Sequence, residues 1–106
     1  MASTGVVDAP HRRVTLDEVR AHRDEIHAAA ERYGVSNIRV FGSVARDEAD
    51  DDSDLDLLVD IDRGLFELTG FALEVEDILN VFTQAATPNG LKERMRERIM
   101  NEAVAV

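Results

Sequence analysis

The stretch of residues 41–61, FGSVARDEADDDSDLDLLVDI, decides the fold of this chain. Its last part alternates in character, which predicts a strand over Leu55–Ile61 with one apolar face, made of Leu55, Leu57, Val59 and Ile61. Its first part completes a short β-branched run at residues 38–41, which predicts a second buried strand ending at Gly42-Ser43. A helical turn and an acidic loop connect the two strands. The end of the first strand and the start of the second are therefore expected to lie close together.

Upstream of these strands, the sequence predicts one helix. Thr15 and Glu18 have the spacing of a capping box, and Gly34 supplies a left-handed end to the helix. Residues 1–14 have no clear periodicity and are expected to form a flexible tail. The domain is therefore expected to span residues 15–106.

Downstream of the acidic strand, the pattern predicts a helix over residues 65–79, a weaker strand over 81–86 and a final amphipathic helix over 91–104. Helices and strands thus alternate along the chain. This order predicts a small α/β (α+β) fold, with a short mixed β-sheet flanked by about four helices.

The net charge of −10 comes almost entirely from one segment. Between residues 47 and 62 there are nine acidic side chains and no basic ones: Asp47, Glu48, Asp50, Asp51, Asp52, Asp54, Asp56, Asp60 and Asp62. Such a surface is not expected to bind DNA directly, because duplex binding relies on Lys and Arg that neutralise phosphates. The chain also has no cysteine and no apolar run long enough to span a membrane. These features favour a cytoplasmic protein.

Two aspartates of this segment are candidates for metal binding. Asp54 and Asp56 lie two residues apart along the predicted strand, so they share a face opposite the apolar one. Two carboxylates held together repel each other unless a cation neutralises them, and Mg²⁺ suits one or two carboxylates plus substrate phosphates. Gly42 and Ser43 are candidates for gripping a phosphate with backbone amides and a hydroxyl, and Arg46 for adding a positive charge.

Simpler interpretations are favoured elsewhere. Residues 50–52 are expected to form a solvated acidic loop, the usual fate of a charge cluster. A calcium loop of the EF-hand type is excluded, because its sixth position would be Leu55 and its twelfth Ile61. The three histidines, His11, His22 and His27, are interpreted as solvated residues in or before the first helix.

The spacing of these motifs resembles a known family. Gly42-Ser43, ten residues, then Asp54-Leu55-Asp56 matches the signature of nucleotidyltransferases related to DNA polymerase beta. The wider text, at residues 33–46, 53–60 and 90–104, is similar to the minimal nucleotidyltransferases (MNT), which pair with HEPN toxins as antitoxins. The resemblance covers nearly everything from Thr15 onward and implies the small nucleotidyltransferase fold.

The resemblance implies an enzyme, a protein adenylyltransferase. Such proteins transfer AMP from ATP to a tyrosine of a HEPN ribonuclease toxin and thereby silence it. By similarity, Asp54 and Asp56 would be catalytic and bind Mg²⁺, while Gly42 and Ser43 would hold the triphosphate of ATP. Partner proteins would be expected to contact exposed apolar residues on the last two helices.

One position departs from the family pattern. The family usually has a third carboxylate on a later strand, and an ungapped match places Gln84 there. Gln84 carries no charge and cannot act as a general base at neutral pH. Two alternatives therefore stay open: a catalytically weakened relative that neutralises its toxin by binding alone, and a transferase that modifies a small molecule.

Overall fold

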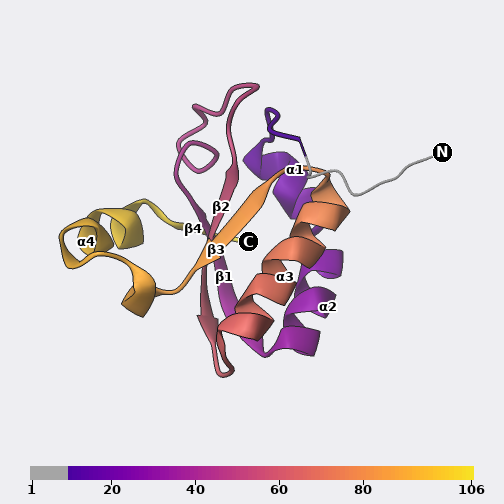
Figure 1. The fold of residues 1–106 in the computed structure, drawn as a ribbon. Helices are drawn as coiled ribbons and strands as arrows, with labels where there is room; N and C mark the ends of the chain where they lie inside the picture. The colour runs from indigo at the N-terminus through magenta and orange to yellow at the C-terminus, as the bar shows by residue number, and fades with distance from the viewer. Residues whose placement is uncertain (1–9) are drawn as a thin grey trace.

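The computed structural model describes residues 10–106, which form a four-stranded sheet with helices on both sides (Figure 1). The elements, in chain order, are α1 (Leu16–Ala21), α2 (Arg23–Tyr33), β1 (Val35–Phe41), β2 (Leu55–Ile61), α3 (Leu65–Leu79), β3 (Thr83–Ala86), the 3₁₀ turn η1 (Pro88–Gly90), α4 (Glu93–Glu102) and β4 (Val104–Ala105). Figure 1 shows α1, α2 and α3 on one side of the sheet and α4 on the other.

The sheet is mixed, with the strand order β3-β2-β1-β4. The central strand β1 runs antiparallel to both β2 and β4, whereas β2 and β3 are parallel and are joined by α3. A parallel pair requires such a crossover, because the chain must return to the starting end of the sheet. The predicted fold class, a small α/β domain with a mixed sheet, is confirmed.

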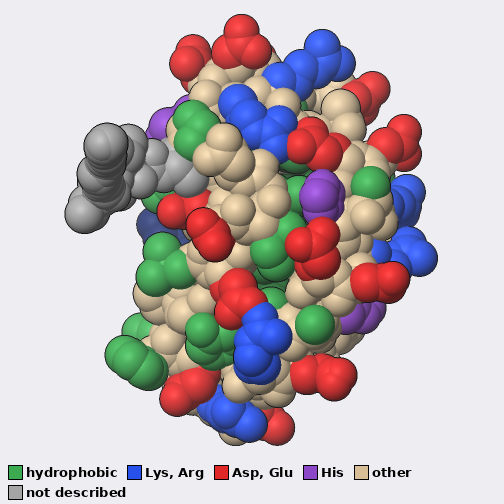
Figure 2. Space-filling view, turned by 90° about the vertical axis from the view of Figure 1, so that its right-hand side faces the viewer, with side chains coloured by type: hydrophobic (Ala, Val, Ile, Leu, Met, Phe, Trp, Pro, Cys, Tyr) green, Lys and Arg blue, Asp and Glu red, His purple; other side chains and the backbone are tan. Residues whose placement is uncertain are grey.

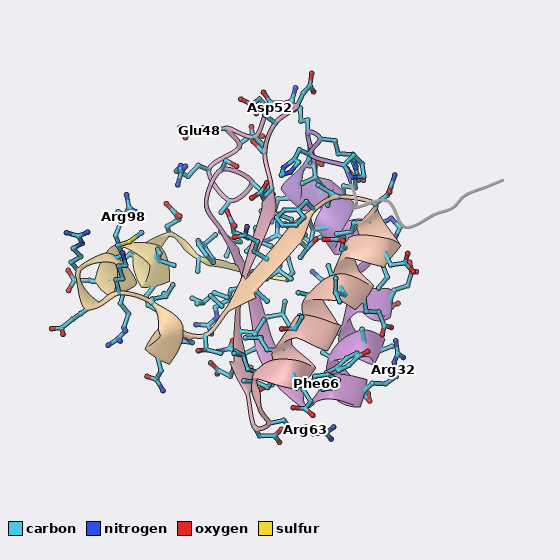
Figure 3. The ribbon with its side chains drawn as sticks, viewed as in Figure 1. Arg32, Glu48, Asp52, Arg63, Phe66 and Arg98 are labelled. Carbon is cyan, nitrogen blue, oxygen red and sulfur yellow. The ribbon has the colours of Figure 1, made fainter. Side chains whose placement is uncertain are left out.

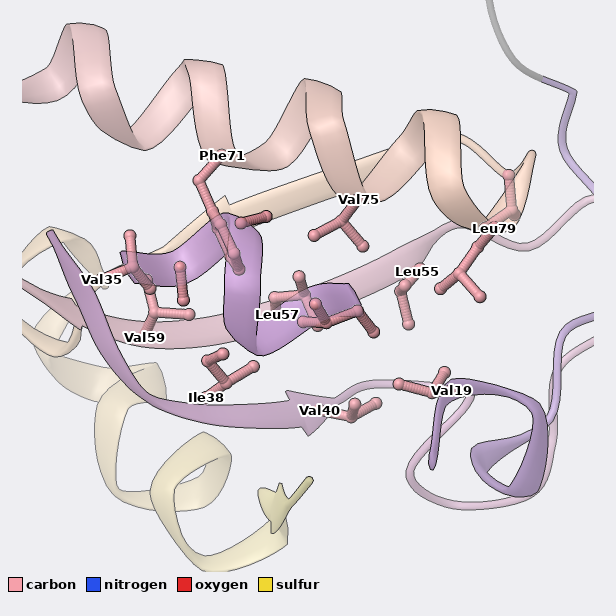
Figure 4. Close-up of a cluster of buried hydrophobic side chains, with 14 of the residues drawn as sticks. Val19, Val35, Ile38, Val40, Leu55, Leu57, Val59, Phe71, Val75 and Leu79 are labelled. Carbon is pink, nitrogen blue, oxygen red and sulfur yellow. The ribbon is translucent and has the colours of Figure 1, made fainter. Parts of the chain in front are cut away.

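The main core lies between the sheet and the pair α2–α3 (Figure 4). Inward-facing side chains of both central strands meet the apolar stripe of α3, and all of them are buried: Ile38, Val40, Leu55, Leu57, Val59, Phe71, Val75 and Leu79. Leu58 is also fully buried, although alternation places it on the face of the aspartates. That second face is covered in part, because α4 lies on its side of the sheet (Figure 1).

The first predicted helix is divided into two, α1 and α2. The chain turns at His22, whose backbone angles (φ −103°, ψ 16°) leave the helical range. Thr15 caps α1 as predicted, because its hydroxyl accepts a hydrogen bond from the Glu18 amide. The reciprocal half of the capping box is absent from the cap that the structure describes, since the Glu18 carboxylate binds Arg12 instead.

The packed part of the chain begins earlier than residue 15. Residues 1–9 of the expected tail lie outside the described residues. Pro10 accepts a backbone hydrogen bond from Phe82, Arg12 donates to the Leu79 and Asn80 carbonyls, and Val14 is only 1% exposed. Residues 10–14 therefore belong to the folded domain.

Candidate nucleotide site

The site is built where β1 ends and β2 begins. Asp56 faces Phe41 across the antiparallel pair, so its side chain lies next to Gly42, which follows Phe41. Gly42 has a φ of +76°, and a β-carbon added there would lie 2.6 Å from Asp56 Oδ2. Only glycine both adopts this backbone conformation easily and leaves room for the carboxylate. Gly42 is therefore needed for the close approach of Asp56 to the turn.

Asp54 lies just before β2 and contacts two other segments. Its Oδ1 is 2.6 Å from Nδ1 of His11, and its Oδ2 accepts a 3.4 Å hydrogen bond from Nε2 of Gln84. The His11 ring in turn packs on Phe82, with ring centroids 5.1 Å apart. Gln84 is also paired with Asp56 in the parallel register of β2 and β3. Gln84 is thus directly beside the two aspartates.

The two aspartates interact electrically. The pKa of Asp56 is raised to about 6, mainly by burial and also by the charges of Asp54 and Glu102, while Arg46 acts in the opposite direction. Removal from water and a like charge both disfavour the ionised carboxylate. A carboxylate under such repulsion is suited to bind a cation, which would relieve it.

The donor set of this corner fits Mg²⁺. Asp54 and Asp56 offer hard oxygen ligands, and Mg²⁺ is commonly held by one or two carboxylates with phosphates and water completing its octahedron. Across residues 10–106, no three His, Asp or Glu side chains are grouped so that they could hold a metal ion by themselves.

The turn after β1 carries the other candidate residues. The Arg46 amide donates to the Gly42 carbonyl and the Glu48 amide donates to the Ser43 carbonyl, which closes a helical turn as predicted. The Arg46 guanidinium binds Glu48 at 2.9 Å and Glu102 at 2.8 Å. The structure therefore brings Gly42, Ser43 and Arg46 into one turn beside Asp56.

Two residues at this corner were not predicted from the sequence. Glu102, at the end of α4, accepts a 2.7 Å hydrogen bond from the Gly42 amide. His11 is exposed, as expected for a solvated residue, and it also contacts Asp54. Both contacts join segments more than 40 residues apart, so no local pattern announces them. The sequence indicated only that Glu102 and His11 have side chains able to form hydrogen bonds with the candidate residues.

The loop between β1 and β2 carries acidic residues that are exposed to solvent. Glu48 and Asp52 lie at its tip, whereas Phe66 lies at the far end of α3 (Figure 3). Asp50, Asp51 and Asp52 are exposed, and Asp50 organises the loop by accepting hydrogen bonds from the Asp52 amide and the Ser53 hydroxyl. The interpretation of residues 50–52 as a solvated loop is confirmed. On the helical side, acidic and basic side chains are interspersed (Figure 2).

Among the described residues, none of the helices has the length and apolar character needed to cross a bilayer.

Comparison with known proteins gives a consistent result. The family described as "Nucleotidyltransferase domain" matches residues 23–106. "Protein adenylyltransferase MntA" of Thermococcus cleftensis is 35% identical over 99 residues, which is 88% of this chain and 97% of that protein. "Putative protein adenylyltransferase MJ0435" of Methanocaldococcus jannaschii is 36% identical over 77 residues, covering 71% of this chain and 83% of that protein.

A solved structure is also similar. It is described as "Structure of putative minimal nucleotidyltransferase", and it superposes with a TM-score of 0.77 at 38% sequence identity. The match covers 89% of this chain and 98% of that one. The similarity thus extends over most of both chains.

Proposed function

Because this chain belongs to the nucleotidyltransferase domain family, we propose that it transfers AMP from ATP to a tyrosine of a HEPN ribonuclease toxin and thereby acts as an antitoxin. The observation that carries the proposal is the placement of Asp56 against Gly42, with Asp54 close enough for its charge to raise the pKa of Asp56. The relative named as a protein adenylyltransferase supports a protein as acceptor. The absence of cysteine fits a reducing cytoplasm as the place of reaction.

The reaction is an in-line displacement at the α-phosphorus of ATP. The tyrosine oxygen forms a bond to that phosphorus, the bond to pyrophosphate breaks, and the hydroxyl proton passes to water. Asp54 and Asp56 would hold Mg²⁺, which neutralises charge on the attacking and leaving oxygens when bound. The Gly42-Ser43 turn and Arg46 would orient the triphosphate. Positioning and charge neutralisation are the main contributions that a protein makes to phosphoryl transfer.

The test is to mix the protein with its cognate toxin, ATP and Mg²⁺, and to weigh the toxin by mass spectrometry. We expect the toxin to gain AMP, and Asp54→Asn with Asp56→Asn to abolish the gain. A matched control is Asp51→Asn with Asp52→Asn, which removes the same charge from the exposed loop and should leave the gain intact. An unmodified toxin, or a gain that survives the Asp54 and Asp56 changes, would contradict the proposal.

A second candidate function is neutralisation by binding alone, and Gln84 favours it. Its amide lies 3.4 Å from Asp54 Oδ2, where a carboxylate would add a metal ligand and a base. If the enzyme is weakened for lack of that carboxylate, Gln84→Asp should raise the rate of AMP transfer, whereas Gln84→Asn should not. If binding alone neutralises the toxin, the Asp54 and Asp56 double variant should still protect cells as well as the wild type does.

A further inference from the structure

The C-terminal helix contributes one acidic side chain to the corner of the site. Glu102 is the last residue of α4, and its side chain is 17% exposed. One carboxylate oxygen, Oε2, accepts the Gly42 amide at 2.7 Å, and the other, Oε1, accepts Nη1 of Arg46 at 2.8 Å. A single carboxylate therefore bridges the first residue of the turn and the guanidinium that the same turn presents.

This bridge determines which hydrogen-bond donors of the turn remain available to a substrate. The Gly42 amide is already satisfied by Glu102, so it is not available to donate to a phosphate while the bridge is intact. Arg46 uses Nε and Nη1 for Glu48 and Glu102 and keeps its Nη2 group for an incoming anion. The bridge thus leaves Nη2 as the group of Arg46 that is available to a ligand.

The backbone that follows Glu102 is fixed by pairing with the sheet. Immediately after α4 the chain enters β4, where Val104 pairs with Val40 and Ala105 with Arg39, and the Val106 amide donates to the Ile38 carbonyl. Burial alone would raise the pKa of Glu102, but the Gly42 amide and Arg46 outweigh it, so the pKa is lower than that of an ordinary glutamate. The side chain is therefore ionised at neutral pH and anchored two residues from a paired strand.

From these contacts we propose that Glu102 is a positioning residue for nucleotide transfer, which sets the Gly42 turn and the Arg46 guanidinium in the geometry that receives the triphosphate. The inference rests on the proposed nucleotide site and adds a residue that acts through Gly42 and Arg46. The competing idea is that Glu102 occupies the triphosphate position and must leave it. The anchoring by β4 favours positioning, because the paired strand fixes the backbone of Glu102 beside the Gly42 turn.

The two ideas predict opposite changes in nucleotide binding. We expect Glu102→Ala to bind ATP with Mg²⁺ about tenfold more weakly in calorimetry, because the two hydrogen bonds that set the turn and Arg46 are lost. Glu102→Gln keeps an acceptor for the Gly42 amide and should fall between Ala and the wild type. Glu97→Ala is the matched control, because Glu97 is exposed on the same helix, and it should bind as the wild type does.

The Gly42 amide gives a readout that does not depend on activity. In ¹⁵N-labelled protein, its proton signal should move upfield and exchange faster in Glu102→Ala, and return toward the wild-type position in Glu102→Gln. Tighter ATP binding by Glu102→Ala, binding equal to that of Glu97→Ala, or an unmoved Gly42 signal would each overturn the proposal. Failure of the wild type itself to bind ATP would instead count against the proposed function.

Discussion

At the scale of single residues, Gly42 and Asp56 depend on each other. The carboxylate occupies the space that any side chain at position 42 would need. The positive φ of Gly42 starts the turn that carries Ser43 and Arg46. The glycine thus combines two physical requirements, a left-handed backbone and an open space, which are separable in experiment.

Replacing Gly42 by alanine should damage the site more than the fold. Strain at positive φ costs about 1 kcal/mol, and the new β-carbon must displace Asp56. We expect a modest loss of thermal stability together with a loss of ATP and Mg²⁺ binding in calorimetry. Gly64→Ala is the control, since a β-carbon there meets only Glu67 Oε1 at 3.4 Å. Unchanged binding by Gly42→Ala would show that the close contact is irrelevant.

The raised pKa of Asp56 makes stability depend on pH. Between about pH 4 and pH 6 the folded protein keeps a proton that the unfolded chain has lost, so the free energy of unfolding falls as pH rises through that window. Above pH 6 the ionised carboxylate is a constant cost of about 1–2 kcal/mol, after discounting for solvent screening. Asp56→Asn should therefore be more stable than the wild type near neutral pH and equally stable at about pH 3.5.

Urea unfolding across this pH range measures the effect. Mg²⁺ should stabilise the wild type at neutral pH and have little effect on Asp56→Asn, because a ligand stabilises only the state that binds it. Asp51→Asn serves as the control for a general change in net charge. A stability difference between Asp56→Asn and the wild type that does not grow as pH rises through the window would mean that Asp56 is not under repulsion.

At the scale of elements, the contact between α2 and α3 depends on one small residue. A β-carbon at Gly70 of α3 would lie 2.5 Å from Cε1 of Tyr33 on α2. Glycine in the middle of a helix costs roughly 0.5–1 kcal/mol relative to alanine. That cost is accepted here because the Tyr33 ring lies across the helix.

The effect of Gly70→Ala on stability should consequently be opposite in sign in the wild type and in a Tyr33→Ala variant. In the wild type we expect it to lower the melting temperature, because the ring and the new methyl group overlap. In a Tyr33→Ala background it should raise the free energy of unfolding by about 0.5–1 kcal/mol, the gain in helix propensity. A double-mutant cycle by thermal unfolding measures this. Destabilisation of equal size in both backgrounds would show that Tyr33 is not the obstacle.

Elements with a strong local pattern could be predicted, and elements set by distant contacts could not. The strand Leu55–Ile61 and the helix Leu65–Leu79 have the bounds that alternation and the apolar stripe predicted. The two-residue strand β4 was missed, because its pairing with Arg39 and Val40 has no local signature. For the same reason, the spacing of the motifs predicted Gly42 and Asp56 as candidate site residues. The contacts of Glu102 and His11 became visible only in the folded structure.

At the scale of the whole molecule, a groove with exposed apolar side chains lies along the edge strand that carries Gln84. It runs between α3 and β3 and is lined in part by Leu65, Leu73, Phe82 and Gln84. Leu65, Phe66 and Leu73 of α3 are exposed, as is Met100 of α4. Gln84, which also lines the groove, contacts Asp54. An acceptor protein lying in this groove would therefore contact β3, the strand next to the aspartates.

Leu73→Ser tests this route. Leu73 is 57% exposed, so its replacement should leave the fold and ATP binding intact while raising the toxin concentration needed for half-maximal AMP transfer. Met100→Ser, on the opposite side of the sheet, is the control and should leave that concentration unchanged. The measurement is the initial rate of AMP transfer against toxin concentration. Equal behaviour of the two variants would place the acceptor elsewhere.

The contact between Gly42 and Glu102 spans 60 residues of chain. While the protein is being made, β1, β2 and the acidic loop leave the ribosome long before α4 does. A nascent chain in that period has the aspartates but lacks the carboxylate that braces the turn. Under the positioning role inferred for Glu102, full affinity for ATP would arise only late in synthesis, once α4 and β4 have folded onto the sheet.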